Sequence, residues 1–97
     1  MAFALTGARV FDGDAIHAGI AVVIDGPRIV DIITIDKLAG SMARRNLDGG
    51  LLAPGFIDVQ VNGGGGALLN DDPTVECVRR IAESHRKFGT TGMLPTV

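Results

Sequence analysis

The stretch LLAPGFIDVQVNGGGG, from Leu51 to Gly66, constrains the fold more than any other part of the chain. Pro54-Gly55 interrupts regular structure. The run from Phe56 to Asn62 is rich in β-branched residues and is bounded by turn signals, so it predicts a short strand. Four glycines follow it. Because α/β proteins bind ligands at the carboxyl ends of their strands, the end of this strand is the first place to look for a site.

The predicted strand has one apolar and one polar face, because successive side chains of a strand point to opposite sides. The apolar face is expected to hold Ile57, Val59 and Val61. The polar face is expected to hold Asp58, Gln60 and Asn62. Polar side chains are not buried without partners, so this face predicts solvent, a hydrogen-bonded network or a site. For Asp58, which has no carboxylate or histidine at a useful spacing, a structural hydrogen bond is the favoured interpretation.

Residues 1–53 consist of short apolar runs separated by turn signals every few residues. The clearest pair is a hairpin, with strands from Ile20 to Ile24 and from Arg28 to Ile35 around the turn Asp25-Gly26-Pro27. The segment from Lys37 to Met42 is read as one helical turn or a loop. This pattern predicts a small all-β sandwich domain.

Residues 54–97 instead predict strand, helix and strand, which is the βαβ unit of a parallel sheet. The helix is expected to begin with Asp72 as its cap and Pro73 at its first position, and to end at Gly89. The second strand is predicted from Gly92 to Val97. The apolar stripe of the helix is expected to hold Val75, Val78, Ile81, Ala82 and Phe88.

A lone βαβ unit leaves strand edges unpaired and one sheet face uncovered. The fold class we expect is therefore α/β, with residues 54–97 as the start of a (β/α)8 metal-dependent hydrolase barrel of roughly 200–250 residues. The chain would then be the N-terminal segment of a longer enzyme.

Two strings carry a resemblance to a known family. PGFID from Pro54 resembles the first barrel strand of the amidohydrolase superfamily. The longer PGFIDVQVNG, followed by Asn70-Asp71, and GTTGMLPT from Gly89 resemble the N-acetylglucosamine-6-phosphate deacetylases. The resemblance covers nearly the whole chain. It implies an enzyme of amino-sugar catabolism that converts N-acetylglucosamine 6-phosphate to glucosamine 6-phosphate and acetate.

The resemblance also implies where the chemistry lies. Most members of the superfamily have two metal ligands, His-x-His, where this sequence has Gln60 and Asn62. Amide oxygens are weaker zinc ligands than imidazole. The resemblance implies one divalent metal ion, zinc or similar. Its ligands and a carboxylate base would lie beyond Val97. The metal would polarise the acetamide carbonyl and activate a water. Gln60 would then reach the site through a water or through a hydrogen bond to substrate.

The site-proximal residues expected within this chain are Gln60, Asn62, Gly63 and Gly64. No catalytic residue is expected here, and the 97 residues alone are expected to be inactive. The glycine run fits neither the dinucleotide fingerprint nor a Walker loop. A loop that needs positive φ and close backbone approach is favoured, and it could line the substrate mouth.

Two histidines stand outside these motifs. His17 is placed in a turn and His85 on the helix. Neither has a partner at the spacing of a helical metal pair, so both are interpreted as structural or solvated.

Charge and composition narrow the class of protein. The formal net charge of −2 and the scattered basic residues predict no binding of nucleic acid or anionic membranes. The single cysteine, Cys77, excludes an internal disulfide. There is neither an 18-residue apolar run nor a signal peptide pattern, so a cytoplasmic protein with a small-molecule substrate is expected. The resemblance implies a homo-oligomer at full length.

Three alternatives stay open. Another amidohydrolase, such as a dihydroorotase-like enzyme, would usually show His-x-His at Gln60 and Asn62. A non-catalytic, truncated β/α binding module would bind a partner through its open edges and would bind no metal. A sugar-phosphate-binding protein would use the run from Gly63 to Gly66 and would bind phosphate with these 97 residues alone.

Overall fold

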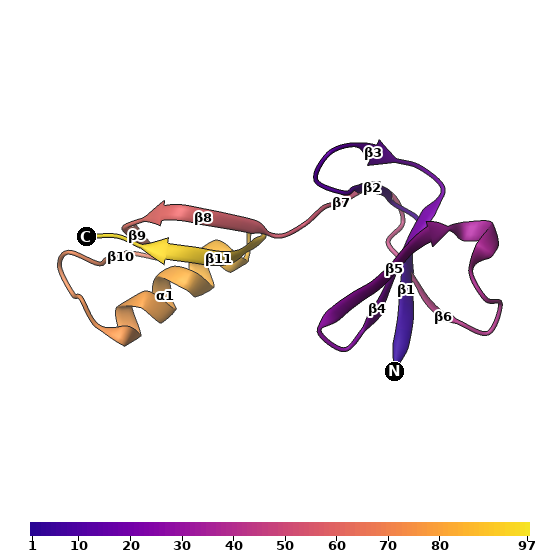
Figure 1. Cartoon of the computed structure of the whole chain (residues 1–97). Helices are drawn as coiled ribbons and strands as arrows, with labels where there is room; N and C mark the ends of the chain where they lie inside the picture. The colour runs from indigo at the N-terminus through magenta and orange to yellow at the C-terminus, as the bar shows by residue number, and fades with distance from the viewer. The chain divides into compact units, whose positions relative to one another are not determined.

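The computed structural model describes residues Met1–Val97 and divides into two compact units, Met1–Pro54 and Gly55–Val97 (Figure 1). None of its helices has the length and apolar character needed to cross a membrane.

The first unit is built from strands and one short 3-10 turn. Its larger sheet has the order β5-β4-β1-β6 and its smaller sheet has the order β3-β2-β7. The strands are β1 (Ala2–Thr6), β2 (Arg9–Phe11), β3 (Ile16–His17), β4 (Ile20–Asp25), β5 (Arg28–Thr34), β6 (Ala43–Asn46) and β7 (Leu51–Leu52). The expected all-β character of this part of the chain is confirmed.

The predicted hairpin of the first unit is confirmed. Strands β4 and β5 pair antiparallel from Ile20 opposite Thr34 to Asp25 opposite Arg28. Gly26 in the turn has a φ of 58°, a conformation that favours glycine because it has no Cβ. A register shift after Val23 adds one residue to β5.

Strand β4 is buried on both faces because it lies between β5 and β1. Ala21 and Val23 pack with Ala4 and Leu38 in one core cluster. Val22, on the opposite face, lines an apolar cavity of about 180 Å³ together with Val10 of the smaller sheet. The two sheets thus face each other across apolar side chains, as in a small sandwich.

Two details of the first unit differ from the sequence prediction. His17 lies in the two-residue strand β3, which pairs with β2, and not in a turn. The helical turn η1 (Ile35–Lys37) begins two residues earlier than the segment in which it was considered. Strands this short show too little hydrophobic periodicity to be predicted from sequence. Whether such a segment is a strand depends on the strand with which it pairs.

The second unit contains the predicted strand, helix and strand. Its elements are β8 (Phe56–Val61), β9 (Gly63–Gly64), β10 (Ala67–Leu68), α1 (Val75–Arg86) and β11 (Thr90–Pro95). Strands β8 and β11 pair in parallel, which confirms the parallel arrangement. Helix α1 covers one face of this pair (Figure 1). The assignment to a barrel stays a prediction.

Helix α1 begins and ends differently from the prediction. Its N-cap is Thr74, whose hydroxyl accepts a hydrogen bond from the Cys77 N–H at 3.1 Å, so the predicted cap at Asp72 is wrong. Its C-cap is Lys87. Phe88 lies beyond the helix and is 79% exposed, so it does not belong to the buried stripe. Gly89 follows with a φ of 98° and ends the turn as expected.

The core of the second unit is small. Its four buried residues come from β8, the loop after β10 and α1, and they are Val61, Leu69, Cys77 and Ile81. Ile81 is completely buried, and Cys77, which the predicted stripe omitted, is 4% exposed. Val75, in contrast, is largely exposed. The buried stripe of α1 is therefore rotated from the predicted one toward Cys77.

The predicted faces of β8 are wrong, because a bulge interrupts the strand. Asp58 pairs with Met93 and Val61 pairs with Pro95, so two residues of β8 stand opposite one residue of β11. An extra residue reverses the alternation of side chains. Val61 is consequently 5% exposed, whereas Ile57 and Val59 on the other face are 73% and 69% exposed.

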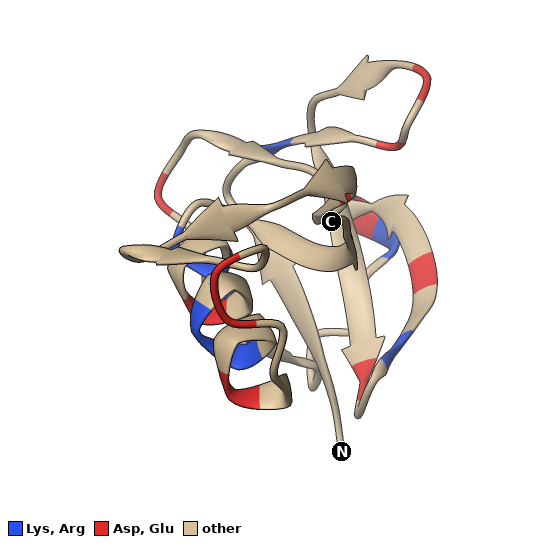
Figure 2. Cartoon of the chain, turned by 90° about the vertical axis from the view of Figure 1, so that its left-hand side faces the viewer, with Lys and Arg blue, Asp and Glu red and all other residues tan.

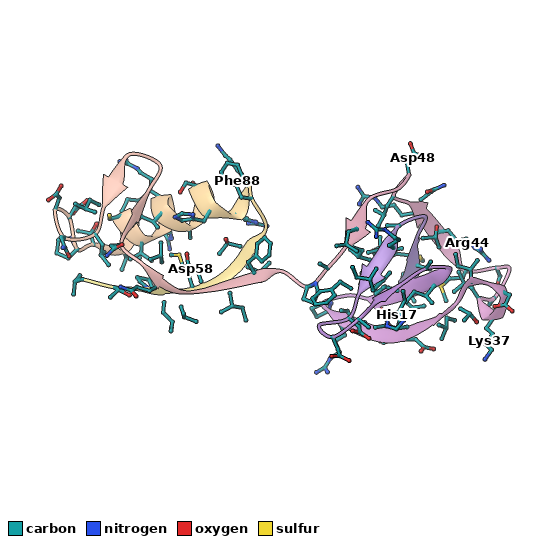
Figure 3. The ribbon with its side chains drawn as sticks, turned by 90° about the horizontal axis from the view of Figure 1, so that it is seen from above. His17, Lys37, Arg44, Asp48, Asp58 and Phe88 are labelled. Carbon is teal, nitrogen blue, oxygen red and sulfur yellow. The ribbon has the colours of Figure 1, made fainter.

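Asp58 stabilises this bulge. Its Oδ1 accepts a hydrogen bond from the backbone N–H of Gln60 at 3.1 Å. Figure 3 shows the Asp58 side chain on the side of β8 that faces α1. This hydrogen bond is consistent with the expected structural role of Asp58, which stays a prediction; the bond lies at the bulge.

Candidate functional site

The candidate site is the carboxyl end of β8 with the hairpin that follows it. Gln60 and Asn62 are exposed, and Gly63 and Gly64 are half-buried. Bulges are common beside functional sites because they redirect the side chains that follow. Here the bulge lies between Asp58 and Val61 and includes Gln60, so it sets the direction in which this amide leaves the strand.

The glycine run forms a tight hairpin, which the sequence prediction read as an irregular loop. Gly64 pairs with Ala67 and Gly63 pairs with Leu68. The two turn residues, Gly65 and Gly66, have φ values of 59° and 78°. Two successive positive φ angles are typical of a type I′ turn, which favours glycine at both positions. The predicted need for positive φ in this segment is confirmed.

The hairpin lies directly against α1. His85 donates a hydrogen bond from Nε2 to the carbonyl oxygen of Gly63 at 2.9 Å. A Cβ placed on Gly64 would come within 2.5 Å of Ser84 Oγ and 2.7 Å of His85 Nε2. Sequence reasoning missed both contacts because the residues are far apart in the chain. The expected close backbone approach is thus found at Gly64.

The residues of the chain do not supply a metal site. No group of three or more His, Cys, Asp or Glu side chains is arranged to hold a metal ion. Cys77 is buried in the core of the second unit. The neutral amides of Gln60 and Asn62 are poor zinc ligands by comparison with imidazole. This donor set does not fit a divalent metal on its own.

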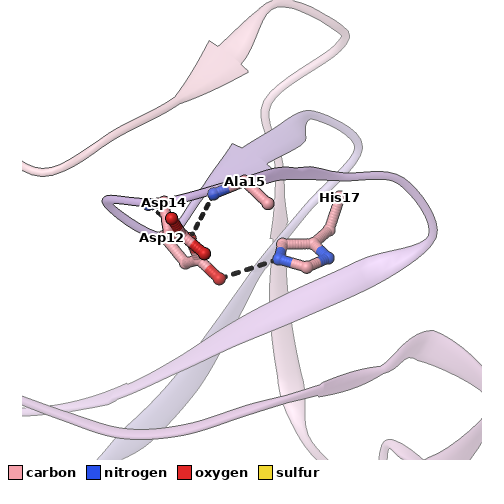
Figure 4. Close-up of polar contacts among 4 residues, drawn as sticks. All are labelled: Asp12, Asp14, Ala15 and His17. Atoms are coloured by element: carbon pink, nitrogen blue, oxygen red, sulfur yellow. Dashed lines mark hydrogen bonds and ion pairs between the residues drawn. The ribbon is translucent and has the colours of Figure 1, made fainter.

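A second polar cluster lies in the turn between β2 and β3 (Figure 4). Asp12 Oδ1 accepts hydrogen bonds from the N–H groups of Asp14 and Ala15, each at 2.8 Å. Asp12 Oδ2 lies 2.8 Å from His17 Nε2. His17 therefore has a partner five residues away across the hairpin, where the sequence analysis found none at helical spacing.

These contacts change the acidity of one group in the cluster. The backbone N–H of Ala15, followed by the His17 side chain and the backbone N–H of Asp14, lowers the pKa of Asp12 from 3.8 to about 2. Hydrogen bonds to the ionised form are the cause. The cluster closes the turn between β2 and β3, and it belongs to no group of side chains that could hold a metal ion.

A groove of about 530 Å³ lies between α1 and the amino-terminal half of β11. Arg79, Glu83 and Arg86 line it with Thr90 and Thr91. Figure 2 shows charges of both signs along α1, so the groove presents no field of one sign. It does not coincide with the carboxyl end of β8 and is not part of the candidate site.

The chain is similar to a known family and to two enzymes of known activity. The family model of the NagA composite domain matches residues 2–52. An N-acetylgalactosamine-6-phosphate deacetylase of a Shewanella species is 59% identical over 51 residues, which is 53% of this chain and 13% of that protein. An N-acetylglucosamine-6-phosphate deacetylase of Haemophilus influenzae is 34% identical over 96 residues, which is 99% of this chain and 25% of that protein.

A solved structure is similar to both units. The N-acetylglucosamine-6-phosphate deacetylase of Pasteurella multocida matches 98% of this chain with a TM-score of 0.89 and 33% sequence identity. The match covers 25% of that protein. The chain thus spans about a quarter or less of the length of the relatives it matches.

Proposed function

Because this chain belongs to the family of the NagA composite domain, we propose that it is the N-terminal segment of a metal-dependent amidohydrolase that deacetylates N-acetylglucosamine 6-phosphate. The products are glucosamine 6-phosphate and acetate. The observation that carries the proposal is the similarity to the Haemophilus influenzae enzyme, because it extends over 99% of this chain and so includes the end of β8.

We propose a separate role for each unit. Residues 1–53 would form most of a small β domain, and residues 54–97 would form the first βαβ unit of a (β/α)8 barrel. Parallel pairing of β8 with β11 supports this assignment. So does the exposure of Ile57 and Val59 on the face of β8 away from α1, because a closed barrel fills its interior with apolar side chains.

At the site, Gln60, Asn62, Gly63 and Gly64 would line the substrate side of the barrel mouth. Gln60 would act on substrate by a hydrogen bond or through a bridging water. The divalent metal that we propose for the complete enzyme would take its ligands from residues outside 1–97. The catalytic carboxylate and the groups that bind phosphate would come from there as well.

The proposed substrate implies a location and a kind of partner. A phosphorylated sugar carries charge, which is costly to move into an apolar membrane, so the sugar stays in the compartment where it is phosphorylated, and we propose the cytoplasm as that compartment. The partner of the chain is then a small amino-sugar phosphate. A homo-oligomeric full-length enzyme is part of the same proposal.

A second substrate is favoured by one observation. The identity to the Shewanella N-acetylgalactosamine-6-phosphate deacetylase is higher, at 59%, although it extends over only 51 residues. The two amino sugars differ in the configuration of one ring hydroxyl, at C4. Residues that distinguish them must contact that hydroxyl, and the shorter match leaves nearly half of this chain without a counterpart.

The test is to measure acetate release by the complete enzyme that carries these residues. We expect N-acetylglucosamine 6-phosphate to be hydrolysed with a higher kcat/KM than its galactosamine epimer, and we expect residues 1–97 alone to be inactive. A preference for the epimer would establish the second substrate. Absence of acetate from both sugars by metal-loaded enzyme, or turnover by residues 1–97 alone, would refute the proposal.

Substitution of Gln60 by Ala in the complete enzyme tests its proposed place at the site. We expect turnover to fall by about ten- to hundredfold, the range for groups that orient a metal site, while bound metal measured by elemental analysis stays near that of the wild type. Asn70→Ala changes an exposed amide outside the candidate site and serves as the control. Stoichiometric loss of metal in Gln60→Ala would instead make Gln60 a direct ligand.

A further inference from the structure

Helix α1 is tied to the backbone immediately after β8. The Nε2–H of His85 donates to the carbonyl oxygen of Gly63 at 2.9 Å, and the two residues are 22 positions apart. Gly63 directly follows Asn62, the last polar residue of the candidate site. A side chain from the last turn of the helix therefore holds the backbone of the candidate site at Gly63, the residue after Asn62.

Two glycines of the hairpin, Gly64 and Gly65, also lie against α1 without side chains of their own. A Cβ at Gly65 would lie 3.1 Å from Ser84 Cβ, and one at Gly64 would lie only 2.5 Å from Ser84 Oγ. Ser84 Oγ donates to the carbonyl oxygen of Ile81 at 2.8 Å, so its hydroxyl is turned back along the helix. The absence of side chains in β9 is what allows His85 to reach the hairpin backbone.

The other side of the hairpin is closed by a backbone hydrogen bond. The N–H of Leu69 donates to the carbonyl oxygen of Asn62 at 2.8 Å. Leu69 is itself buried beside Ile81. The carbonyl oxygens of two successive residues are thus held, that of Asn62 by Leu69 and that of Gly63 by His85.

The hairpin needs such attachments because it is very short. Strands β9 and β10 have two residues each, and a two-stranded hairpin alone is at best marginally stable in water. Local opening begins in segments with few buried contacts. Without the hydrogen bond from His85, the Gly63–Leu68 segment keeps its own pairing and loses its one polar contact with an α1 side chain.

We propose that His85 is a positioning residue for the deacetylation reaction. Its hydrogen bond to Gly63 holds the hairpin on α1 and thereby keeps Gln60 and Asn62 in the orientation that substrate requires. His85 itself does not touch substrate. The inference rests on the proposed function, and its test separates the two.

The first test compares His85→Leu with His85→Gln in the complete enzyme. Leucine has similar bulk without a donor, whereas glutamine can present an N–H at a similar reach. We expect His85→Leu to lower kcat/KM by about ten- to hundredfold, because small displacements of positioning groups are costly to catalysis. His85→Gln should recover most of that loss. Equal losses in both variants would contradict a role for the donor.

The second measurement is amide hydrogen exchange, which does not depend on activity. We expect His85→Leu to speed the exchange of the Leu69 N–H by about tenfold, the weight of one hydrogen bond, and His85→Gln to restore it. The N–H of Val23 in β4 is the internal reference and should not change. Unchanged exchange at Leu69 would overturn the anchoring role whether or not the enzyme acts on amino-sugar phosphates.

A steric variant tests the same contact from the hairpin side. Gly64→Ala places a Cβ against Ser84 and His85, so we expect it to lower kcat/KM and to speed Leu69 exchange as His85→Leu does. Gly40→Ala is the matched control, because Gly40 lies in open space and does not need a positive φ. Faster exchange at Leu69 without any loss of kcat/KM would overturn the catalytic part of the inference.

The pattern of failure identifies which idea is wrong. If the wild-type enzyme releases no acetate from either sugar, the proposed function fails and the catalytic part of this inference fails with it. The exchange rates of Leu69 then still decide whether His85 holds the hairpin. If the wild-type enzyme is active and His85→Leu matches it, the function stands and the positioning role is refuted.

Discussion

The core of the second unit offers a quantitative test of the fold. Ile81 is completely buried in the cluster with Val61, Leu69 and Cys77. Its replacement by Ala removes three carbons, which lowers the free energy of unfolding by roughly 2.4 kcal/mol at ~0.8 kcal/mol for each buried carbon. The cavity left behind adds to this loss, and buried Ile→Ala substitutions cost ~2–5 kcal/mol in all.

A loss of this size is decisive in so small a unit. Small hydrophobic cores rarely supply more than about 3–5 kcal/mol, so Ile81→Ala is expected to leave the second unit largely unfolded at 25 °C in the 97-residue chain. Ile57→Ala makes the same chemical change on the same unit at a side chain that is 73% exposed. It is expected to change the free energy of unfolding by less than about 0.5 kcal/mol.

Circular dichroism at 222 nm measures the difference directly. The sequence has no Trp or Tyr, and α1 is the one α-helix, so the helical signal reports on the second unit. We expect Ile81→Ala to lose most of this signal without urea, and Ile57→Ala to keep the wild-type signal and the wild-type urea midpoint. Equal signals from the two variants, whether lost or retained, would refute the placement of Ile81 in the core.

Two further predictions concern a cap and a titrating carboxylate. Thr74→Ala should destabilise α1 by ~0.5–2 kcal/mol, because it removes the acceptor of the Cys77 N–H. Thr74→Ser keeps a hydroxyl and should retain most of the helical signal. Similar urea midpoints for the two variants would contradict this cap. Because the pKa of Asp12 is lowered to about 2 by Ala15 and His17, its ionised form should stabilise the first unit above about pH 4, and this contribution should be lost as the pH falls toward 2. Unfolding followed by NMR between pH 5 and 2 should therefore show a smaller loss of stability in Asp12→Asn than in the wild type, and identical slopes would disprove the assignment.

The elements with strong local signals were predictable. The β4–β5 hairpin follows from two apolar runs around Asp25-Gly26-Pro27, and β8 follows from the breaker before Phe56. The parallel pairing of β8 with β11 was expected because a helix connects them. In each case the signal lies within one continuous segment, so neighbours along the chain contain the required information.

The ends of α1 were predicted less well. Asp72 and Thr74 are both good N-cap residues, and they stand two positions apart, so local preference does not separate them. In the folded chain Thr74 is the cap, and Val75 begins the helix. This start places Cys77 and Ile81, four residues apart, on the same buried side.

The candidate site likewise combines features that were predictable from the sequence with features that were not. That polar residues end β8 and glycines follow them is plain in the sequence, and so is the need for positive φ in that run. The paired hairpin was missed because two-residue strands have no periodicity to detect. The contact of His85 with Gly63 was missed because it joins positions 22 apart, and no spacing rule along a helix or strand connects them.

The sequence alone specified the kind and order of the longer elements and the residue types at the end of β8, because propensities and turn signals act between neighbours. Tertiary structure decided which side chains of β8 are buried. The reversal after Asp58 requires a register with β11 in which two residues face one, and a register exists only once both strands are paired. Tertiary structure likewise decided that α1 holds the glycine hairpin, since that contact forms only when the helix folds back beside β8.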